Sequence, residues 1–355
     1  MRIRRTFPIV LAVLVIAGAV VLAVQLRKHA PPEPARLLPG ADGLLYVDYS
    51  WVRKANGKPF NPVIHEPEYE QFIQETGFDY ERDLDSVAFA VHYPQSWPGG
   101  GTGGSAPEPR FSEVFIGRFD TEKCSAYLKK IAKSVENYDS VDIFTIPIYA
   151  RTFRVAILGV DAVAASNHED PTVIRGMIDR SRRLASPFGG PALLRKYYKH
   201  VQLASPVWLV AHVDPTSPEF GSWSGFLPNP ADVVISASFN PLHLPLRAGV
   251  LHLRAEAWAA TESDAHAIAD KLNYFLAMFH GAETSVGAIG ADADVKTMFE
   301  SLEVRQDDNR AVLVAAVPLG VIKKLSDSSD QIPTMAAPAP TQTPKPEKKQ
   351  ASKKR

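Results

Sequence analysis

The sequence predicts an α+β fold made of two related units. Each unit is expected to be a mostly antiparallel sheet with helices packed on one face, and one transmembrane helix precedes them. Three observations support this prediction. An apolar run opens the chain, short strands rich in β-branched and aromatic residues recur after it, and a strand–helix–hairpin pattern occurs twice.

The amino-terminal segment is typical of a membrane anchor. From Phe7 to Leu26 no side chain is charged, and about 20 helical residues span a hydrocarbon core of about 30 Å. The alternative is a signal peptide cleaved near residues 17–19, which would leave the apolar stretch VVLAVQL at the mature end. We therefore expect an uncleaved anchor in the inner (plasma) membrane.

Flanking charges predict the orientation of this anchor. Arg2, Arg4 and Arg5 precede the apolar run, whereas only Arg27 and Lys28 follow it. The side richer in basic residues stays in the cytoplasm. The bulk of the chain is therefore expected to be extracytoplasmic, in the periplasm.

Changes in composition and proline- or glycine-rich stretches divide the sequence into six segments. The linker is rich in proline, and SPFGGP separates the two units. The predicted segments are a cytoplasmic region 1–6, the anchor 7–26, a linker 27–36, a first α+β unit 37–185, a second unit 191–326 and a disordered tail 327–355 rich in proline and lysine.

In the first unit, strands are expected at 42–52, 85–93, 110–119 and 162–167, and a hairpin at 141–159. A helix is expected at 66–78, ended by Gly77. A second helix begins near Thr121, which can act as its N-cap, and a third follows Pro171.

In the second unit, strands are expected at 205–214 and 231–239, and a strand running into a long helix at 249–279. Apolar residues recur on that helix at spacings of 3 and 4: Ala265, Ile268, Leu272, Phe275 and Phe279. A short helix near 295–302 and a hairpin turning at 307–309 complete the unit.

The two units share a pattern. RFDTEKCSAYLKKI and WAATESDAHAIADKL each read as a strand, then Thr-Glu, then an amphipathic helix, and a hairpin follows each. The alternative is a chance likeness between two strand–helix units, because few residues are identical.

Charge and cysteine content exclude several classes of function. The 39 basic and 39 acidic residues balance, so no overall field favours nucleic acid, and none is expected as a partner. Cys124 is the one cysteine, which excludes an intramolecular disulfide, and on an apolar helix face we expect a buried, inert thiol.

Several motifs approach catalytic signatures without completing them. Gly99, Gly101 and Gly104 have the spacing of a dinucleotide loop, but prolines and a strand follow instead of a helix N-terminus. FGSWSGF places Trp223 where the nucleophile elbow requires serine. We expect no catalytic, cofactor or metal residues, and so no enzyme.

The segment 167–170 (NHED) is the strongest candidate for metal or acid–base chemistry. His168 stands beside Glu169 and Asp170, although acids here also suit the start of a helix. We favour the capping interpretation. A hydrolase or metal enzyme with a site dispersed in the sequence is the alternative.

Aromatic residues in loops and basic residues in the tail are the candidate contact sites. Trp97, Phe220, Trp223 and Phe226 lie in Gly/Pro-rich connections, where exposed rings could bind a partner or instead cover the core. The candidate contacts to an anionic surface are Lys345, Lys348, Lys349, Lys353, Lys354 and Arg355.

Four phrases give the chain a resemblance to a known group: ARLLPGADGLLYVDYSWVRKA, EYEQFIQETGFDYERDLDSVAFAVH, AVAASN and VRQDDNRAVLVAAVP. They resemble a family of uncharacterised bacterial envelope proteins with an N-terminal membrane anchor. The resemblance implies localisation alone. Together these observations predict a membrane-anchored, non-catalytic envelope protein that binds or scaffolds, with another envelope protein or an anionic wall polymer as its partner.

Overall fold

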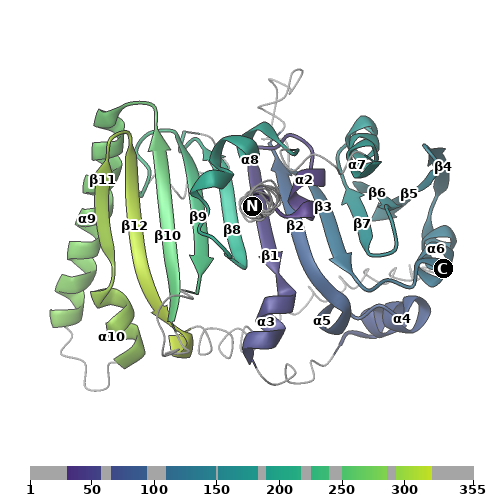
Figure 1. Ribbon diagram of the computed structural model, residues 1–355, viewed down its shortest axis with the longest axis horizontal. Coiled ribbons are helices and arrows are strands. Elements are labelled where there is room, and N and C mark those ends of the chain that lie inside the picture. The colour runs from purple at the N-terminus through teal and green to yellow at the C-terminus, as the bar shows by residue number, and fades with distance from the viewer. Residues whose placement is uncertain are drawn as a thin grey trace, which may run out of the picture.

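The computed structural model describes eight stretches of the chain, and all structural statements below concern them: 30–56, 65–93, 109–148, 151–182, 189–216, 225–239, 250–285 and 293–321. They form an α+β fold dominated by one antiparallel sheet of 12 strands (Figure 1). Both predicted units therefore contribute to a single sheet.

The strands follow the order β11-β12-β10-β9-β8-β1-β2-β3-β7-β6-β5-β4, and every neighbouring pair is antiparallel. Their bounds are β1 Gly43–Asp48, β2 Leu84–His92, β3 Arg110–Gly117, β4 Ser134–Tyr138, β5 Val141–Ile148, β6 Arg151–Ile157, β7 Ala162–Ser166, β8 Val207–Val213, β9 Ala231–Ser238, β10 Val250–Ala259, β11 Glu303–Asp307 and β12 Arg310–Pro318.

Ten described helical segments accompany the sheet. They are α2 Glu33–Leu37, α3 Tyr49–Asn56, α4 Pro67–Thr76, α5 Tyr80–Asp83, α6 Thr121–Ile131, α7 Thr172–Arg182, α8 Ala192–Tyr197, the 3₁₀ turn η2 Tyr198–His200, α9 Glu262–Ser285 and α10 Ala293–Glu300.

The two halves have the same outward strand order from the centre of the sheet. β1 and β8 pair at the centre, and each begins a run of three neighbouring strands, β1-β2-β3 and β8-β9-β10. In the first half, α6 follows the third strand, β3, and the last strand, β7, pairs with β3. In the second half, α9 follows β10, and the last strand, β12, pairs with β10. The hairpins predicted after these helices are present as β5–β6 and β11–β12, whereas β4, which pairs with β5, was not predicted from the sequence.

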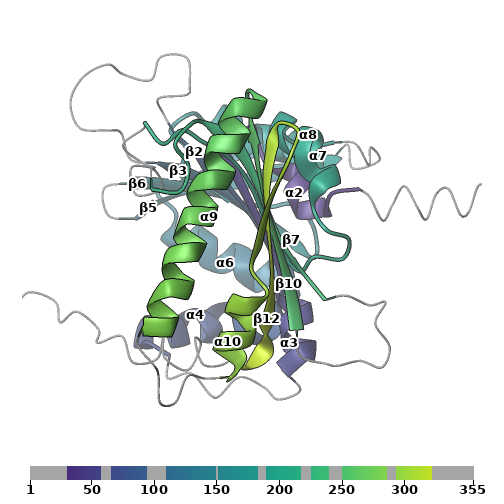
Figure 2. The same ribbon diagram turned by 90° about the vertical axis from the view of Figure 1, so that its left-hand side faces the viewer.

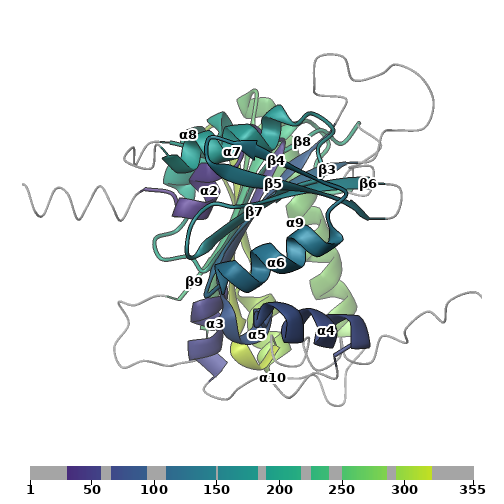
Figure 3. The same cartoon turned by 90° about the vertical axis from the view of Figure 1, so that its right-hand side faces the viewer.

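Helices cover both faces of the sheet, so the prediction of helices on one face is wrong. Figures 2 and 3 show α2, α7 and α8 on one side and α4, α6 and α9 on the other. Side chains of a strand alternate between faces, and here both faces carry apolar residues that need cover.

The two cores follow this alternation. On β8, Trp208 and Val210 belong to the core under α2, α7 and α8, whereas Ala211 and Val213 belong to the core under α9. The first core also joins the halves, because the ring of Tyr46 on β1 stacks on that of Trp208 at 5.5 Å.

Local structure differs from the sequence prediction in three places. The strand expected at 42–52 ends at Asp48 and continues as α3, whose start is held by Asp48 Oδ1 accepting from Trp51 N. Residues 33–37, expected at the end of the linker, form α2, with Ala35 and Leu37 fully buried. Thr121 is the first residue of α6, and Asp120 is the N-cap.

Other predicted features are confirmed. Gly77 ends α4 with a φ of +72°, and Cys124 is buried. On α9, Ala265, Ile268 and Leu272 face the second core, whereas the side chain of Phe279 lies outside the described residues. No helix within the described stretches is both long and apolar enough to cross a bilayer, and the predicted anchor Phe7–Leu26 lies outside them.

Candidate binding cleft

Four strands place a row of polar and aromatic side chains on one face of the sheet. His212 of β8 lies opposite Asp232 of β9, Asp232 lies opposite Trp258 of β10, and Trp258 lies opposite Arg310 of β12. Because cross-strand neighbours point to the same face, these four side chains form a continuous row near the strand ends.

The helix α8 and the turn η2 complete the site above this row. Tyr197 is buried at the end of α8, and its neighbours Lys196, Lys199 and His200 contribute further polar groups. Together with the sheet they enclose a cleft of about 380 Å³, lined by Lys196, Tyr197, Lys199, His200, His212, Pro230, Ala231, Asp232, Trp258, Ala259, Ala260 and Asn309.

Asp232 accepts hydrogen bonds from three lining residues. His212 Nδ1 lies 2.8 Å from Oδ1, Lys196 Nζ lies 3.3 Å from Oδ2, and the Tyr197 hydroxyl donates to Oδ2. Burial acts to raise the pKa of this carboxyl, but the three donors outweigh that effect and lower the pKa to about 2. Asp232 therefore stays ionised at physiological pH.

The pKa values of the two histidines in the cleft are shifted in opposite directions. The hydrogen bond with Asp232 raises the pKa of His212 above its usual value, against the effect of burial. Burial instead lowers the pKa of His200, whose ring centroid lies 4.3 Å from that of Trp258. His200 is thus the neutral histidine and His212 the one that gains a proton first.

A buried ion cluster contacts Trp258 on the same face of the sheet. Glu256, with a side chain only 2% exposed, accepts from the Trp258 indole N–H at 3.1 Å and pairs with Arg254 at 2.6 Å and Arg310 at 3.2 Å. The Arg310 guanidinium also lies 5.0 Å from the Trp258 ring centroid. The wall formed by Trp258 is therefore held in place from two sides.

The chemistry available in the cleft is that of binding and proton transfer. The lining side chains include no serine, threonine or cysteine, so the described walls contain no hydroxyl or thiol nucleophile of the usual activated kind. The His212–Asp232 pair has the geometry of a general base held by a carboxylate.

A second group looks catalytic by composition but is sealed. His92 Nε2 lies 3.0 Å from Ser112 Oγ, which lies 2.9 Å from Ser166 Oγ. Ser112 is fully buried, and burial lowers the pKa of His92 to about 4. Without access for a substrate, this histidine–serine group has a structural role.

The NHED segment takes the capping role favoured from the sequence. Asp170 Oδ1 accepts from the backbone N–H of Thr172 at the start of α7, at 2.8 Å. Glu169 pairs with Arg110, and His168 Nδ1 accepts from Asp170 N at 3.1 Å. Within the described stretches, no group of three or more His, Cys, Asp and Glu side chains is arranged to hold a metal.

Of the four predicted aromatic contacts, only Phe226 lies in the described residues. It is 43% exposed, and its ring centroid lies 4.8 Å from that of Phe275 on α9. Tyr274 and Met278 of the same helix are also exposed. The remaining predicted contacts are outside the described residues: Trp97, Phe220, Trp223, Lys345, Lys348, Lys349, Lys353, Lys354 and Arg355.

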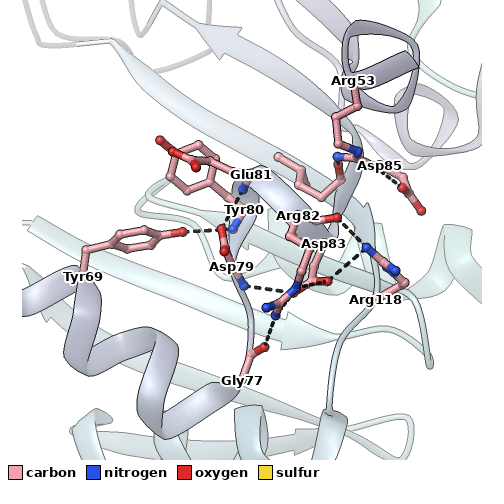
Figure 4. A network of polar contacts seen from close by, with 11 residues as sticks. Arg53, Tyr69, Gly77, Asp79, Tyr80, Glu81, Arg82, Asp83, Asp85 and Arg118 are labelled. Carbon is pink, nitrogen blue, oxygen red and sulfur yellow. Dashed lines mark hydrogen bonds and ion pairs between the residues drawn. The ribbon is translucent and has the colours of Figure 1, made fainter. Parts of the chain in front are cut away.

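The polar network in Figure 4 joins α5 to its neighbours. Asp83 is buried and pairs with Arg82 at 2.6 Å and Arg118 at 3.2 Å, while Asp79 N donates to its Oδ2 at 3.1 Å. Although burial acts to raise the pKa of Asp83, these bonds lower it. Every oxygen of this carboxylate is satisfied, so we assign the network to stability.

Sequence reasoning missed the cleft. His212 and Asp232 are 20 residues apart, and Tyr197 lies 35 residues before Asp232. Each strand did carry a sign of the site, a polar residue near the end of an apolar run. His212 lies near the end of VWLVAHV, and Asp232 lies near the start of ADVVISAS. Only strand pairing shows that the two side chains meet.

Comparisons with known proteins add the following findings. No protein-family model matches the chain, and no curated protein matches it. Solved structures with a distant likeness include crystal forms of TP0453. Form III has 9% identity and a TM-score of 0.44, covering 84% of this chain and 99% of that one. Form IV has 9% identity and a TM-score of 0.42, covering 83% and 97%. A likeness at this level carries no conclusion about function.

Proposed function

We propose that this protein is a membrane-tethered, extracytoplasmic, non-catalytic binding module, and that the cleft beneath α8 is its ligand site. The observation that carries this proposal is the cleft itself. Its polar groups converge from α8, η2, β8 and β9 and are fixed by hydrogen bonds, as in a preformed ligand site.

Blocking the cleft tests this proposal. Ala260 lines the cleft and is exposed, so Ala260→Trp fills it without disturbing the core. We expect fragments that bind the full chain in non-ionic detergent to lose binding in this variant, as measured by ligand-observed NMR. Ala126→Trp, at an exposed site on α6, is the matched control. Equal fragment binding by both variants would refute the cleft as the ligand site.

The alternative function, a hydrolase, is favoured by one observation, the His212–Asp232 pair. It predicts turnover of nitrophenyl esters or phosphates that His212→Gln abolishes. The binding module predicts no turnover above that of the variant. Tightly bound stoichiometric metal in the purified chain would favour the enzyme as well.

The tether is tested separately from the cleft. We expect protease added to spheroplasts to degrade residues 35–355, because the basic flank before Phe7 keeps only the amino terminus inside. Protection of this region while the membrane is intact would reverse the proposed orientation. Crosslinking in intact cells would then identify the envelope partner.

We further infer that the two halves are related units. The shared strand order outward from the β1–β8 pair supports this, as does the position of α6 and α9 after the third strand of each half. Both helices also lie on the same side of the sheet (Figure 2).

A further inference from the structure

One lysine of the cleft has no ion-pair partner among the residues that the structure describes. Lys199 of η2 lines the cleft and forms no ion pair with any described residue. Lys196, in contrast, is bound by Asp232 at 3.3 Å, and Arg310 is paired with Glu256 and Asp307. Lys199 is therefore the lysine available to an incoming anion.

His212 offers a second donor in the same cleft. Its Nδ1 is engaged by the Asp232 carboxylate, so that nitrogen carries a proton, and Nε2 is the remaining ring nitrogen. The side chain is 52% exposed and lines the cleft. When protonated, the ring can donate from Nε2 while keeping its bond to Asp232.

Among the lining residues, the charge balance favours an anion. Lys196 and Lys199 provide two ammonium groups against the carboxylate of Asp232, and protonation of His212 adds a positive charge, while Asp42 and Asp214 act on His212 from outside the lining. Bound water is a weaker competitor for a charged donor in a cleft than at an open surface. A small negative ligand would complete this set of charges.

Part of the lining is apolar. Pro230, Ala260 and the ring of Trp258 line the cleft, whereas the side chains of Ala231 and Ala259 pack in the core on the other face of the sheet. A volume of about 380 Å³ is near the lower end of the usual range for ligand pockets, roughly 300–1,000 Å³. A cleft of this size and lining fits a small molecule with an apolar body.

We propose that the cleft binds a small organic oxyanion, a carboxylate or phosphate, between Lys199 and His212, with its apolar body against Trp258 and Ala260. This inference rests on the proposed function, since it names the ligand class of the same cleft. The shared chemistry is an oxyanion that accepts hydrogen bonds from an ammonium group and an imidazolium.

The proposal has a defined pH dependence. His212 is hydrogen-bonded to Asp232 of β9, and Asp42 before β1 and Asp214 after β8 also act to raise its pKa. Lys196 and Tyr197 of α8 bind the same Asp232 carboxylate. Since its pKa is raised, anion affinity is expected to be highest below that pKa and to fall as the pH rises through it. A neutral ligand would show no such fall.

The test compares three probes of similar size on the full chain in non-ionic detergent: benzoate, phenyl phosphate and the neutral benzyl alcohol. We expect at least one anion to bind about tenfold or more tightly than benzyl alcohol, a difference near 1.4 kcal/mol. The benzoate and phenyl phosphate arms show which oxyanion is preferred. Benzyl alcohol binding as tightly as both anions would overturn the proposal.

Variants assign the effect to the named residues. Lys199→Gln should weaken anion binding about fivefold, whereas Lys129→Gln on α6, also an exposed lysine, should not. His212→Gln should flatten the pH profile, and His266→Gln on α9 should preserve it. Unchanged affinity in Lys199→Gln overturns the oxyanion proposal. If neutral fragments still bind the full chain and lose binding in Ala260→Trp, the proposed function stands although the oxyanion proposal fails. If every fragment binds Ala260→Trp as well as it binds the full chain, both proposals fail.

Discussion

At the scale of single residues, the cleft depends on Asp232. This carboxylate accepts from His212 on the neighbouring strand and from Lys196 and Tyr197 on α8, so one side chain fixes a strand and a helix at once. A residue of this kind cannot be recognised from its own position, because its role is set by partners 20 to 36 residues away.

Gly117 is required by close backbone packing. A Cβ at this position would lie 2.5 Å from the carbonyl oxygen of Asp83 and 3.2 Å from the Leu84 Cα. Gly117→Ala is therefore expected to lower the free energy of unfolding by about 1–3 kcal/mol, measured by urea denaturation. Gly40→Ala, where a Cβ would contact nothing within 4 Å, is the control and should change little. Equal stability of the two variants would contradict this account.

Glu113 is expected to destabilise the fold when ionised. It lies on β3 opposite Phe89 and Ala165, forms no hydrogen bond or ion pair with any described residue, and burial raises its pKa. The pKa of this carboxyl is higher in the folded protein than in the unfolded chain. Ionisation therefore lowers the free energy of unfolding only above the unfolded-state pKa, and the full loss is reached as the pH rises through the folded-state pKa. Glu113→Gln should thus be more stable than wild type by about 1 kcal/mol near neutral pH.

Urea denaturation of both proteins across the pH range checks this prediction. The stability gain of Glu113→Gln should shrink as the pH falls toward about 4, where both states bind the proton. Glu68→Gln, at an exposed site on α4, should show no gain at any pH. A gain that is independent of pH would exclude ionisation of Glu113 as its cause.

At the scale of elements, the two helices that follow Thr-Glu begin differently. In α6 Asp120 is the N-cap and accepts from Lys123 N, so Thr121 is already helical. Before α9, Thr261 Oγ1 accepts from Asp264 N at 3.1 Å and donates to its carboxylate at 2.7 Å. The same sequence pair therefore occupies two different positions relative to its helix.

This difference predicts unequal effects of equal substitutions. Thr261→Ala removes a cap and should lower the free energy of unfolding by about 1 kcal/mol. Thr121→Ala leaves the cap of α6 intact and, at an ordinary helical position, should change it by less than about 0.5 kcal/mol. Chemical denaturation of the two variants measures the difference, and a larger loss in Thr121→Ala would refute the assignment of Asp120 as the cap.

At the scale of the whole molecule, the two halves share one sheet and the core under α2, α7 and α8. β1 pairs with β8 over five residue pairs, and Leu194, Tyr197 and Trp208 of the second half pack in the same cluster as Leu44 and Tyr46 of the first. Separation would expose this core and two central strand edges.

We therefore expect neither half to fold alone. Chains covering 30–185 and 189–321, expressed separately, should lack the cooperative thermal unfolding of the full chain, as followed by circular dichroism. Mixing the halves should restore part of it. Cooperative unfolding of either half at the temperature of the full chain would show that the halves are independent domains.

The tail is expected to give the molecule its contact with anionic surfaces. Lys345, Lys348, Lys349, Lys353 and Lys354 stand with Arg355 against one acid, Glu347, while the whole chain is neutral. The full chain should bind anionic liposomes or wall polymer at low salt and release them by about 0.5 M salt, as screening shortens the range of the attraction. A chain ending at Ser326 should lose this binding; equal retention would exclude the tail.

The sequence by itself determined the class of fold and most of its elements, because strand and helix periodicities are local properties. β5 to β7, β8, β9 and the apolar face of α9 lie where alternation and spacing predicted them, and Gly77 ends α4 as its type predicts. Tertiary structure alone decided that both halves form one sheet, that helices cover both faces, and that α2 is part of the core. It also created the cleft, since His212, Asp232 and Lys199 lie on separate elements.

Which strands pair depends on contacts between distant segments, and these long-range pairings leave no periodic pattern in the residues that form them.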